Sequence, residues 1–175
     1  MGVIFVAGVH AVGKTTACTH AALTSKLVHF TASSLIKGEK ANAIPETGKA
    51  VADLEGNQDL LIRGVQRSLL ENNGRIILDG HFTLPTFNGQ IEAIGLDVFR
   101  ALTLEYVVVY YDEPAAIAAR LCQRDGGARD ADAIAHHQDA ELAAARAVTA
   151  ELGVPLTLLA AFDSISLVEV ISQWN

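Results

Sequence analysis

Residues 8–15, Gly8-Val9-His10-Ala11-Val12-Gly13-Lys14-Thr15, decide the fold. They match the spacing G-x-x-x-x-G-K-T, follow the apolar run 3–7 and precede a helical pattern over residues 13–23. Between a strand and a helix, such a glycine-rich turn points its backbone N–H groups at one centre, beside the positive end of the helix dipole. The stretch therefore predicts a phosphate-binding loop at the end of a β-strand.

The positions of this loop differ in the chemistry that they offer to a nucleotide. Lys14 supplies a mobile ammonium group to the β- and γ-phosphates, and the Thr15 hydroxyl is a ligand for Mg²⁺. The Thr16 hydroxyl is placed to donate a hydrogen bond to the α-phosphate. We expect the phosphates to be bound by a set of residues from the loop and its helix: Gly8, His10, Ala11, Val12, Gly13, Lys14, Thr15 and Thr16.

A carboxylate at the end of a second apolar run completes the predicted site. Asp79 directly follows the run 75–78, and this pattern indicates an acid that orients Mg²⁺ together with Thr15. His81 lies two residues further on, and we expect it to face the phosphate-transfer site. The alternative for His81 is a partly buried histidine with a backbone partner.

The rest of the chain alternates short apolar runs with helical patterns. Because the runs are apolar on both faces, they are typical of a parallel sheet that helices cover on both sides. We therefore predict an α/β fold with a doubly wound, five-stranded parallel sheet. The expected strands are 3–7, 26–30, 75–79, 106–112 and 155–159, and the expected helices are 13–23, 33–40, 57–72, 114–123, 131–152 and 164–174.

The length of 175 residues predicts one domain over residues 1–175. Two stretches interrupt the alternation. One is a flap over about residues 33–72, whose part from 38 to 56 is polar and contains Pro45 and Gly48. The other is a short glycine-rich lid over about residues 124–131. We expect both to close over a ligand, and plain solvated connections are the alternative.

The composition excludes several other classes of protein. A net charge of −7 argues against a nucleic-acid-binding face. No run approaches the roughly 20 consecutive apolar residues that span a bilayer. The two cysteines have no metal-ligand partners at a recognisable spacing, which is typical of a reduced compartment. We therefore expect a cytoplasmic protein without nucleic-acid or membrane partners.

Absent motifs narrow the class further. The chain has no Asn-Lys-x-Asp guanine-reading motif, and Phe82 occupies the glycine position of a D-x-x-G switch, so a small GTPase is excluded. The segment after Pro155 offers no room for the helical domain of the ring ATPases. A phosphotransferase that acts on a small acceptor is the leading class.

Four patches of the chain resemble the archaeal-type adenylate kinases of the nucleoside monophosphate kinase family. The order of elements agrees over nearly the whole chain. The specific patches are residues 8–16, Asp79-Gly80-His81, Arg120 with Arg129-Asp130, and residues 134–138. The resemblance implies ATP as the phosphoryl donor, Mg²⁺ as cofactor and a nucleoside monophosphate as the small-molecule acceptor.

The resemblance also implies a catalytic set. Arg120 and Arg129 reach from the lid to the transferring group, since guanidinium matches phosphate oxygens in pairs. The other members of the set are Lys14, Asp79 and His81.

The acceptor side departs from this family. Its commoner members carry an arginine shortly after Asp-Gly, but residues 79–85 contain none. Arg63 and Arg67 lie on one face of a predicted helix and are candidate ligands for an acceptor phosphate, or else ordinary solvated charges. Three functions stay open: a nucleoside monophosphate kinase, a kinase for another small hydroxyl acceptor, and an NTP-binding switch or accessory ATPase.

Overall fold

The computed structural model describes residues 2–42, 54–86 and 88–173, and its centre is a five-stranded parallel sheet. Within this part of the chain the strand order is β2-β3-β1-β6-β7, and each neighbouring pair is parallel. The predicted α/β fold with a doubly wound sheet is therefore confirmed. The strands are β1 (Gly2–Ala7), β2 (Val28–Thr31), β3 (Arg75–Asp79), β6 (Leu104–Tyr111) and β7 (Leu156–Ala160).

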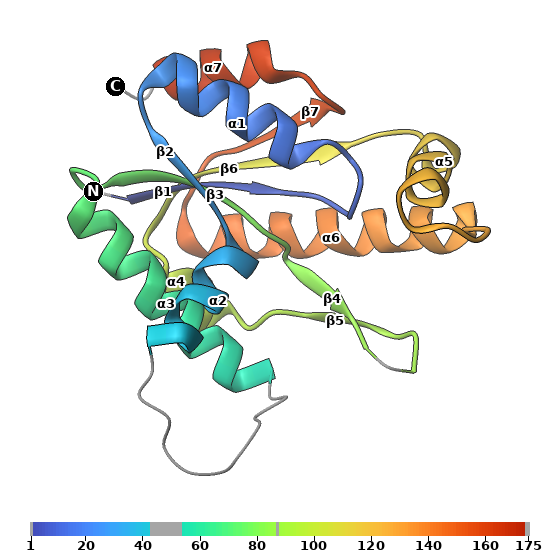
Figure 1. The fold of residues 1–175 in the computed structure, drawn as a ribbon, viewed down its shortest axis with the longest axis horizontal. Helices are drawn as coiled ribbons and strands as arrows, with labels where there is room; N and C mark the ends of the chain where they lie inside the picture. The colour runs from blue at the N-terminus through green and yellow to red at the C-terminus, as the bar shows by residue number, and fades with distance from the viewer. Residues whose placement is uncertain (1, 43–53, 87, 174–175) are drawn as a thin grey trace.

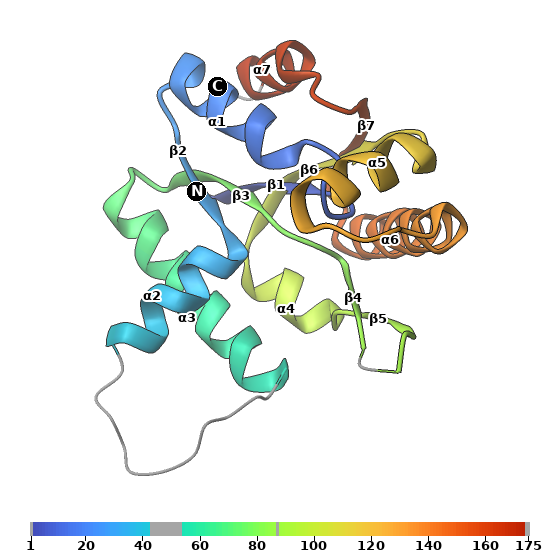
Figure 2. The same cartoon turned by 45° about the vertical axis from the view of Figure 1, so that its right-hand side comes forward.

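Helices cover both faces of the sheet because β1, its central strand, is apolar on both sides. Ile4 and Val6 pack into a core with α1 (Lys14–Ser25) and α7 (Ser164–Ser172). Val3 and Phe5 pack into the opposite core with α3 (Leu54–Glu71), α4 (Leu96–Ala101) and part of α6 (Ala131–Leu152). Figures 1 and 2 show these two layers above and below the sheet.

A hairpin and a short helix lie between β3 and β6, where the sequence predicts neither. β4 (Thr83–Pro85) and β5 (Ile91–Ala93) pair antiparallel, and α4 follows them. These elements are only three to six residues long. Such short segments carry too little periodicity to stand out in a sequence.

The predicted flap is more helical than expected. α2 (Ala32–Asn42) and α3 extend into the stretch 38–56, which was expected to be irregular. Gly38 lies inside α2, so tertiary context outweighs its low helix propensity there. Residues 43–53 of the predicted flap lie outside the described residues.

The predicted lid is the connection between α5 (Pro114–Asp125) and α6. α6 begins at Ala131 as predicted, and the side chain of Asp130 caps it by accepting a hydrogen bond from the backbone N–H of Asp132. Arg124 and Asp125 belong to the last turn of α5, so the irregular part is confined to residues 126–130. A search of the described helices finds none that is both long and apolar enough to cross a membrane.

The carboxyl ends of β1, β2, β3 and β6 lie at one edge of the sheet because all of these strands are parallel. In open α/β sheets, ligands bind at this edge. The glycine-rich loop follows β1, and Asp79 ends β3. The fold thus places the two halves of the predicted site side by side.

Candidate functional site

The loop between β1 and α1 has a backbone that its two glycines make possible. Gly8 and Gly13 have φ angles of 136° and 101°, in a region that side chains rarely adopt. A Cβ on Gly8 would lie 2.6 Å from the Tyr110 carbonyl oxygen, and one on Gly13 would lie 2.7 Å from a ring carbon of Phe162. Both positions therefore require glycine for this loop to form.

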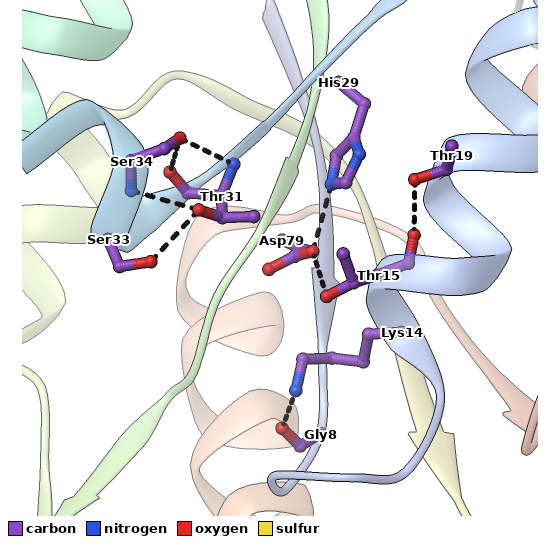
Figure 3. Close-up of polar contacts among 9 residues, drawn as sticks. All are labelled: Gly8, Lys14, Thr15, Thr19, His29, Thr31, Ser33, Ser34 and Asp79. Atoms are coloured by element: carbon purple, nitrogen blue, oxygen red, sulfur yellow. Dashed lines mark hydrogen bonds and ion pairs between the residues drawn. The ribbon is translucent and has the colours of Figure 1, made fainter. Parts of the chain in front are cut away.

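Lys14 points its ammonium group back across the loop. Its Nζ donates to the carbonyl oxygens of Gly8 and Val9 at 2.6 and 3.1 Å, as Figure 3 shows for Gly8. Burial lowers the pKa of Lys14, and the nearby carboxylates of Asp79 and Glu141 oppose this shift by favouring the charged form. The group is placed to exchange carbonyl oxygens for phosphate oxygens.

The predicted metal pair is brought together. The Thr15 hydroxyl donates to Asp79 Oδ2 at 2.9 Å, which joins the first turn of α1 to the end of β3 (Figure 3). Mg²⁺ prefers such oxygen ligands and usually retains several waters. Thr15 and Asp79 therefore fit the ion that the sequence implies.

His29 is a further partner of Asp79 that the sequence analysis missed. It lies on β2, and its Nε2 is 3.0 Å from Asp79 Oδ2. Cys18 on α1 joins them, since one ligand atom from each of Cys18, His29 and Asp79 lies within 4.8 Å of the others. The register of β2 beside β3 could have indicated His29, because His29 pairs with Ile77, two residues before Asp79.

His81 lies just beyond β3, between two cavities. Its ring is 4.5 Å from the ring of His10 on the loop, centre to centre. Burial, together with the nearby charges of Lys14 and His10, lowers the pKa of His81 to about 2. His81 is therefore uncharged at neutral pH. Its Nδ1 has no hydrogen-bond partner in the described part of the chain and lies 3.8 Å from Glu141 Oε1.

Glu141 on α6 is a buried carboxylate that ties the loop to the segment after β3. It accepts hydrogen bonds from the backbone N–H of Gly8 at 3.3 Å and from those of Phe82 and Thr83 at 2.8 Å each. The Thr83 hydroxyl donates to it at 2.5 Å. Four donors stabilise this buried charge, and in return it fixes both walls of the site.

The sequence contains a signal for Glu141 that we did not use. Ala145 and Val148, four and seven residues later, are buried on the same helix. Spacing of this kind places residue 141 on the inner face of α6. An acid on the buried face of a helix indicates a specific buried role, because a carboxylate is costly to bury without partners.

Arg120 lies beside the phosphate-binding loop, and its predicted role at the transferring group stays a prediction. Its Nε donates to the carbonyl of Ala11 at 2.8 Å, and its terminal nitrogen pairs with Asp112 at 2.6 Å. The guanidinium also lies 5.1 Å from the centre of the Phe162 ring, a cation–π contact. These contacts hold a cation beside the phosphate-binding loop.

The other two lid arginines are placed differently from expectation. Arg124, which does not belong to the predicted catalytic set, lines both the cavity at the loop and a neighbouring cavity at the start of α6. Arg129 lines only the second of these two cavities. Asp125 contacts both, at 2.6 Å from Arg124 and 3.5 Å from Arg129. The role of Arg129 at the transferring group stays a prediction, and it requires the residue to move.

Arg63 and Arg67, the predicted acceptor ligands, line neither of the two cavities described below. Arg63 is exposed on α3. Arg67 pairs with Glu39 of α2 at 2.7 Å. The structure thus does not bring them to the site, and their role in acceptor binding stays a prediction.

Two cavities meet at His81. The first, which we call the P-loop cavity, has a volume of about 450 Å³ and is lined by Lys14, Thr15, Thr16 and Asp79, among others. The second, which we call the apolar cavity, has a volume of about 280 Å³ and lies among β1, α2, α3 and α4. Four residues belong to the lining of both cavities: His10, Ala32, Ser33 and His81. The arrangement can hold two small ligands side by side.

One protein-family model matches most of the chain, including the phosphate-binding loop. The model of a family described as "AAA domain" matches residues 7–138, and the chain belongs to this family of P-loop domains. The match ends before Pro155. In the described structure, the residues beyond Pro155 form β7 and α7 of the same core, and no separate helical domain occurs among them.

Several solved structures share the fold. A gluconokinase from Sinorhizobium meliloti 1021 is 14% identical with a TM-score of 0.53, covering 96% of this chain and 87% of its own. An inferred kinase from Chloroflexus aurantiacus J-10-fl is 14% identical with a TM-score of 0.52, at 99% and 94% coverage. An uncharacterized protein from Eubacterium ventriosum ATCC 27560 is 8% identical with a TM-score of 0.53, at 99% and 97% coverage. No curated protein is significantly similar to the chain.

These likenesses define a P-loop kinase-like α/β fold. They support the broad class that the sequence indicates. They do not support the archaeal adenylate kinase type in particular.

Proposed function

We propose that this protein is a phosphotransferase that transfers the γ-phosphoryl group of ATP to a hydroxyl group of a small molecule. The observation that carries the proposal is the junction of the two cavities at His10, Ser33 and His81. A donor bound on the loop and an acceptor in the apolar cavity would face one another across these residues. Phosphoryl transfer requires chiefly this positioning, together with neutralisation of charge.

The residues proposed to bind the phosphate donor belong to the loop or contact it. Lys14 and Arg120 supply cations to the phosphates, and backbone N–H groups of the loop bind them. Thr15 and Asp79 would hold Mg²⁺, which would neutralise part of the phosphate charge when it is bound. The chemistry then needs an acceptor atom placed in line with the γ-phosphorus.

A hydroxyl acceptor fits the second cavity better than a phosphate does. Among the described residues that line the apolar cavity there is neither arginine nor lysine. An acceptor phosphate buried there would lack a cationic partner, which is costly. In the proposed reaction the hydroxyl oxygen bonds to the γ-phosphorus, the bond to ADP breaks, and a base takes the hydroxyl proton.

His81 and Asp79 are the two candidate bases. Glu141 Oε1, 3.8 Å from His81 Nδ1, favours the tautomer with its proton on Nδ1, which leaves Nε2 free to accept a proton. Asp79 already accepts hydrogen bonds from Thr15 and His29, so it is better suited to the metal. We therefore assign the cation to Asp79 and the hydrogen bond of the acceptor hydroxyl to His81 Nε2. The lowered pKa of His81 makes it a weak base, so the hydroxyl proton passes to it only once the oxygen has bonded to phosphorus.

A nucleoside monophosphate is the second candidate acceptor. Arg124, which lines the P-loop cavity beside Arg120, favours it, because two adjacent guanidinium groups can bind two phosphate groups at once. This would be the adenylate-kinase type of reaction that the sequence patches resemble.

One experiment separates these functions. ATP is incubated with Mg²⁺ and a panel of neutral alcohols, gluconate and nucleoside monophosphates, and phosphorylated products are identified by mass. We expect ADP to form only with a hydroxyl acceptor. Product only from monophosphates would support the second candidate. ATP hydrolysis at one rate, whatever is added, would contradict both and support an accessory ATPase or switch.

A further inference from the structure

The apolar cavity has walls of an unusual kind for a site beside a phosphate-binding loop. Phe5 of β1 and Phe99 of α4 line it, with their ring centres 5.7 Å apart in an edge-to-face arrangement. Leu61 of α3 and Leu84 of β4 belong to the same lining. Aromatic and aliphatic walls of this kind favour a flat apolar body over a hydrated polyol chain.

The same cavity contains no formally charged side chain of the described residues that line it. Its polar members are Ser33, Asn57, Gln58 and the two histidines His10 and His81. A carboxylate or phosphate ligand would lose its hydration there without gaining an ion pair. Uncharged ligands meet no such penalty.

Among the described residues, Asn57 contributes an unpartnered acceptor oxygen to this lining. Its Oδ1 is buried and has no hydrogen-bond partner within the described chain. Buried side-chain oxygens are nearly always paired, and an unpaired one at a cavity wall indicates a ligand that donates to it. Asn57 lies in the first turn of α3, on the side of the cavity formed by that helix.

The volume limits the size of the ligand. Sites for drug-sized ligands measure roughly 300–1,000 Å³. At about 280 Å³ the apolar cavity is slightly smaller than that range. It suits one ring with two short substituents and is small for a whole nucleotide.

We infer that the acceptor is an uncharged alcohol built on one flat ring, with an N–H or O–H group that donates to Asn57 Oδ1 and a hydroxyl group at the His81 side of the cavity. This inference rests on the proposed function, which it deepens by naming the class of acceptor. Sugar acids and nucleoside monophosphates fall outside this class.

A pair of probes of nearly the same shape tests the class of ligand. 3-(Hydroxymethyl)benzamide is neutral and carries both the hydroxyl and an N–H donor, whereas 3-(hydroxymethyl)benzoate carries a charge. Their binding to the whole chain is measured by calorimetry without ATP. We expect the amide to bind at least about tenfold more tightly than the benzoate. Equal binding, or tighter binding of the benzoate, of gluconate or of AMP, would overturn the inference.

Variants at Asn57 test the contact itself. Asn57→Leu removes the acceptor oxygen at similar size, and we expect it to weaken amide binding about tenfold. Gln66→Leu is the matched control, because Gln66 is exposed on the same helix and does not line the cavity. Amide binding that is unchanged in Asn57→Leu would overturn the inference.

A second variant guards against loss of folding in the first. Asn57→Asp keeps an acceptor oxygen and adds a negative charge. It should therefore bind 3-(hydroxymethyl)benzylamine, the cationic analogue, at least about tenfold more tightly than the wild type does. No gain for this cation would contradict the placement of Asn57 at the ligand.

These experiments distinguish failure of the inferred ligand class from failure of the proposed function. If the amide binds through Asn57 but ADP never forms with it, the proposed function is wrong and the ligand class stands. If gluconate or AMP is phosphorylated while the amide does not bind, phosphoryl transfer stands and the inferred class is overturned.

Discussion

The P-loop cavity and the apolar cavity share four lining residues but are built in opposite ways. The P-loop cavity takes much of its lining from one continuous stretch, residues 10–16. The apolar cavity takes single residues from β1, α2, α3, β4 and α4, which are far apart in sequence. The P-loop cavity is therefore formed largely by a local sequence motif, whereas the apolar cavity is formed by tertiary packing.

This difference affects what substitutions can do. In the P-loop cavity, the groups proposed to bind phosphate are backbone N–H groups of a loop that requires Gly8 and Gly13, so few side chains are free to change. In the apolar cavity, the shape and polarity come from side chains that can vary one at a time. Donor chemistry is therefore constrained by the fold, whereas the choice of acceptor is adjustable.

Lys14→Ala gives the largest expected effect. We expect turnover with any acceptor to fall at least about 1,000-fold, because a preorganised cation at the developing charge is lost. The fold should remain, since the Lys14 ammonium contacts only the loop carbonyls of Gly8 and Val9 in hydrogen bonds. Steady-state kinetics and circular dichroism measure the two parts. Turnover near that of the wild type would disprove the assignment of the donor side.

Asp79→Asn is expected to reduce turnover at least about 100-fold while nucleotide still binds. The amide can replace one hydrogen bond with Thr15 or His29 but cannot supply the negative charge that a cation requires. Nucleotide binding by calorimetry, with and without Mg²⁺, accompanies the kinetics. If Asn at this position keeps the Mg²⁺ dependence of binding unchanged, Asp79 does not serve the metal.

The donor half of the molecule could be predicted from the sequence for a physical reason. The loop, α1 and the Thr15–Asp79 pair depend on short-range spacing and on one strand register. The parallel sheet follows from apolar runs buried on both faces, but the order of its strands does not. Even the caps follow local rules, as Gly153 at the end of α6 and Asp163 before α7 show.

The other half could not be predicted, because its parts have no local signal. The β4–β5 hairpin is too short for periodicity. Glu141 reaches the loop only because α6 crosses beneath it, 133 residues away in sequence from Gly8. The sequence patches point to Arg129, whereas the point at which α5 ends places Arg124 at the P-loop cavity.

Arg120→Ala is expected to lower kcat/KM roughly 30-fold, because it removes a guanidinium held beside the loop. This corresponds to a loss of about 2 kcal/mol of transition-state stabilisation. Arg124→Ala should reduce kcat/KM about tenfold, and Arg129→Ala less than about threefold, if the lid keeps the arrangement described. All three are compared by steady-state kinetics with the same acceptor. A larger loss at Arg129 than at Arg124 would show that the lid moves Arg129 to the transferring group, as the sequence patches imply.

Glu141→Gln tests the link between the two cavities. The amide keeps one acceptor oxygen but turns an N–H group toward the donors of Thr83 or Phe82. We expect the free energy of unfolding to fall by about 1–3 kcal/mol, measured by urea denaturation. Glu151→Gln, at an exposed position of the same helix, should change it little. Equal effects of both variants would mean that the buried carboxylate does not fix the site.

Arg63→Ala gives the smallest expected effect and the sharpest test of the comparison. Arg63 is exposed on α3 and lines neither the P-loop cavity nor the apolar cavity, so we expect the acceptor KM to change less than about twofold. Arg67→Ala is a less direct control, because its pairing with Glu39 ties α3 to α2. If Arg63→Ala raises the acceptor KM about tenfold, an anionic acceptor contacts α3. Arg63 would then be an acceptor ligand, as the sequence analysis predicts. A nucleoside monophosphate would replace the uncharged alcohol as the better candidate.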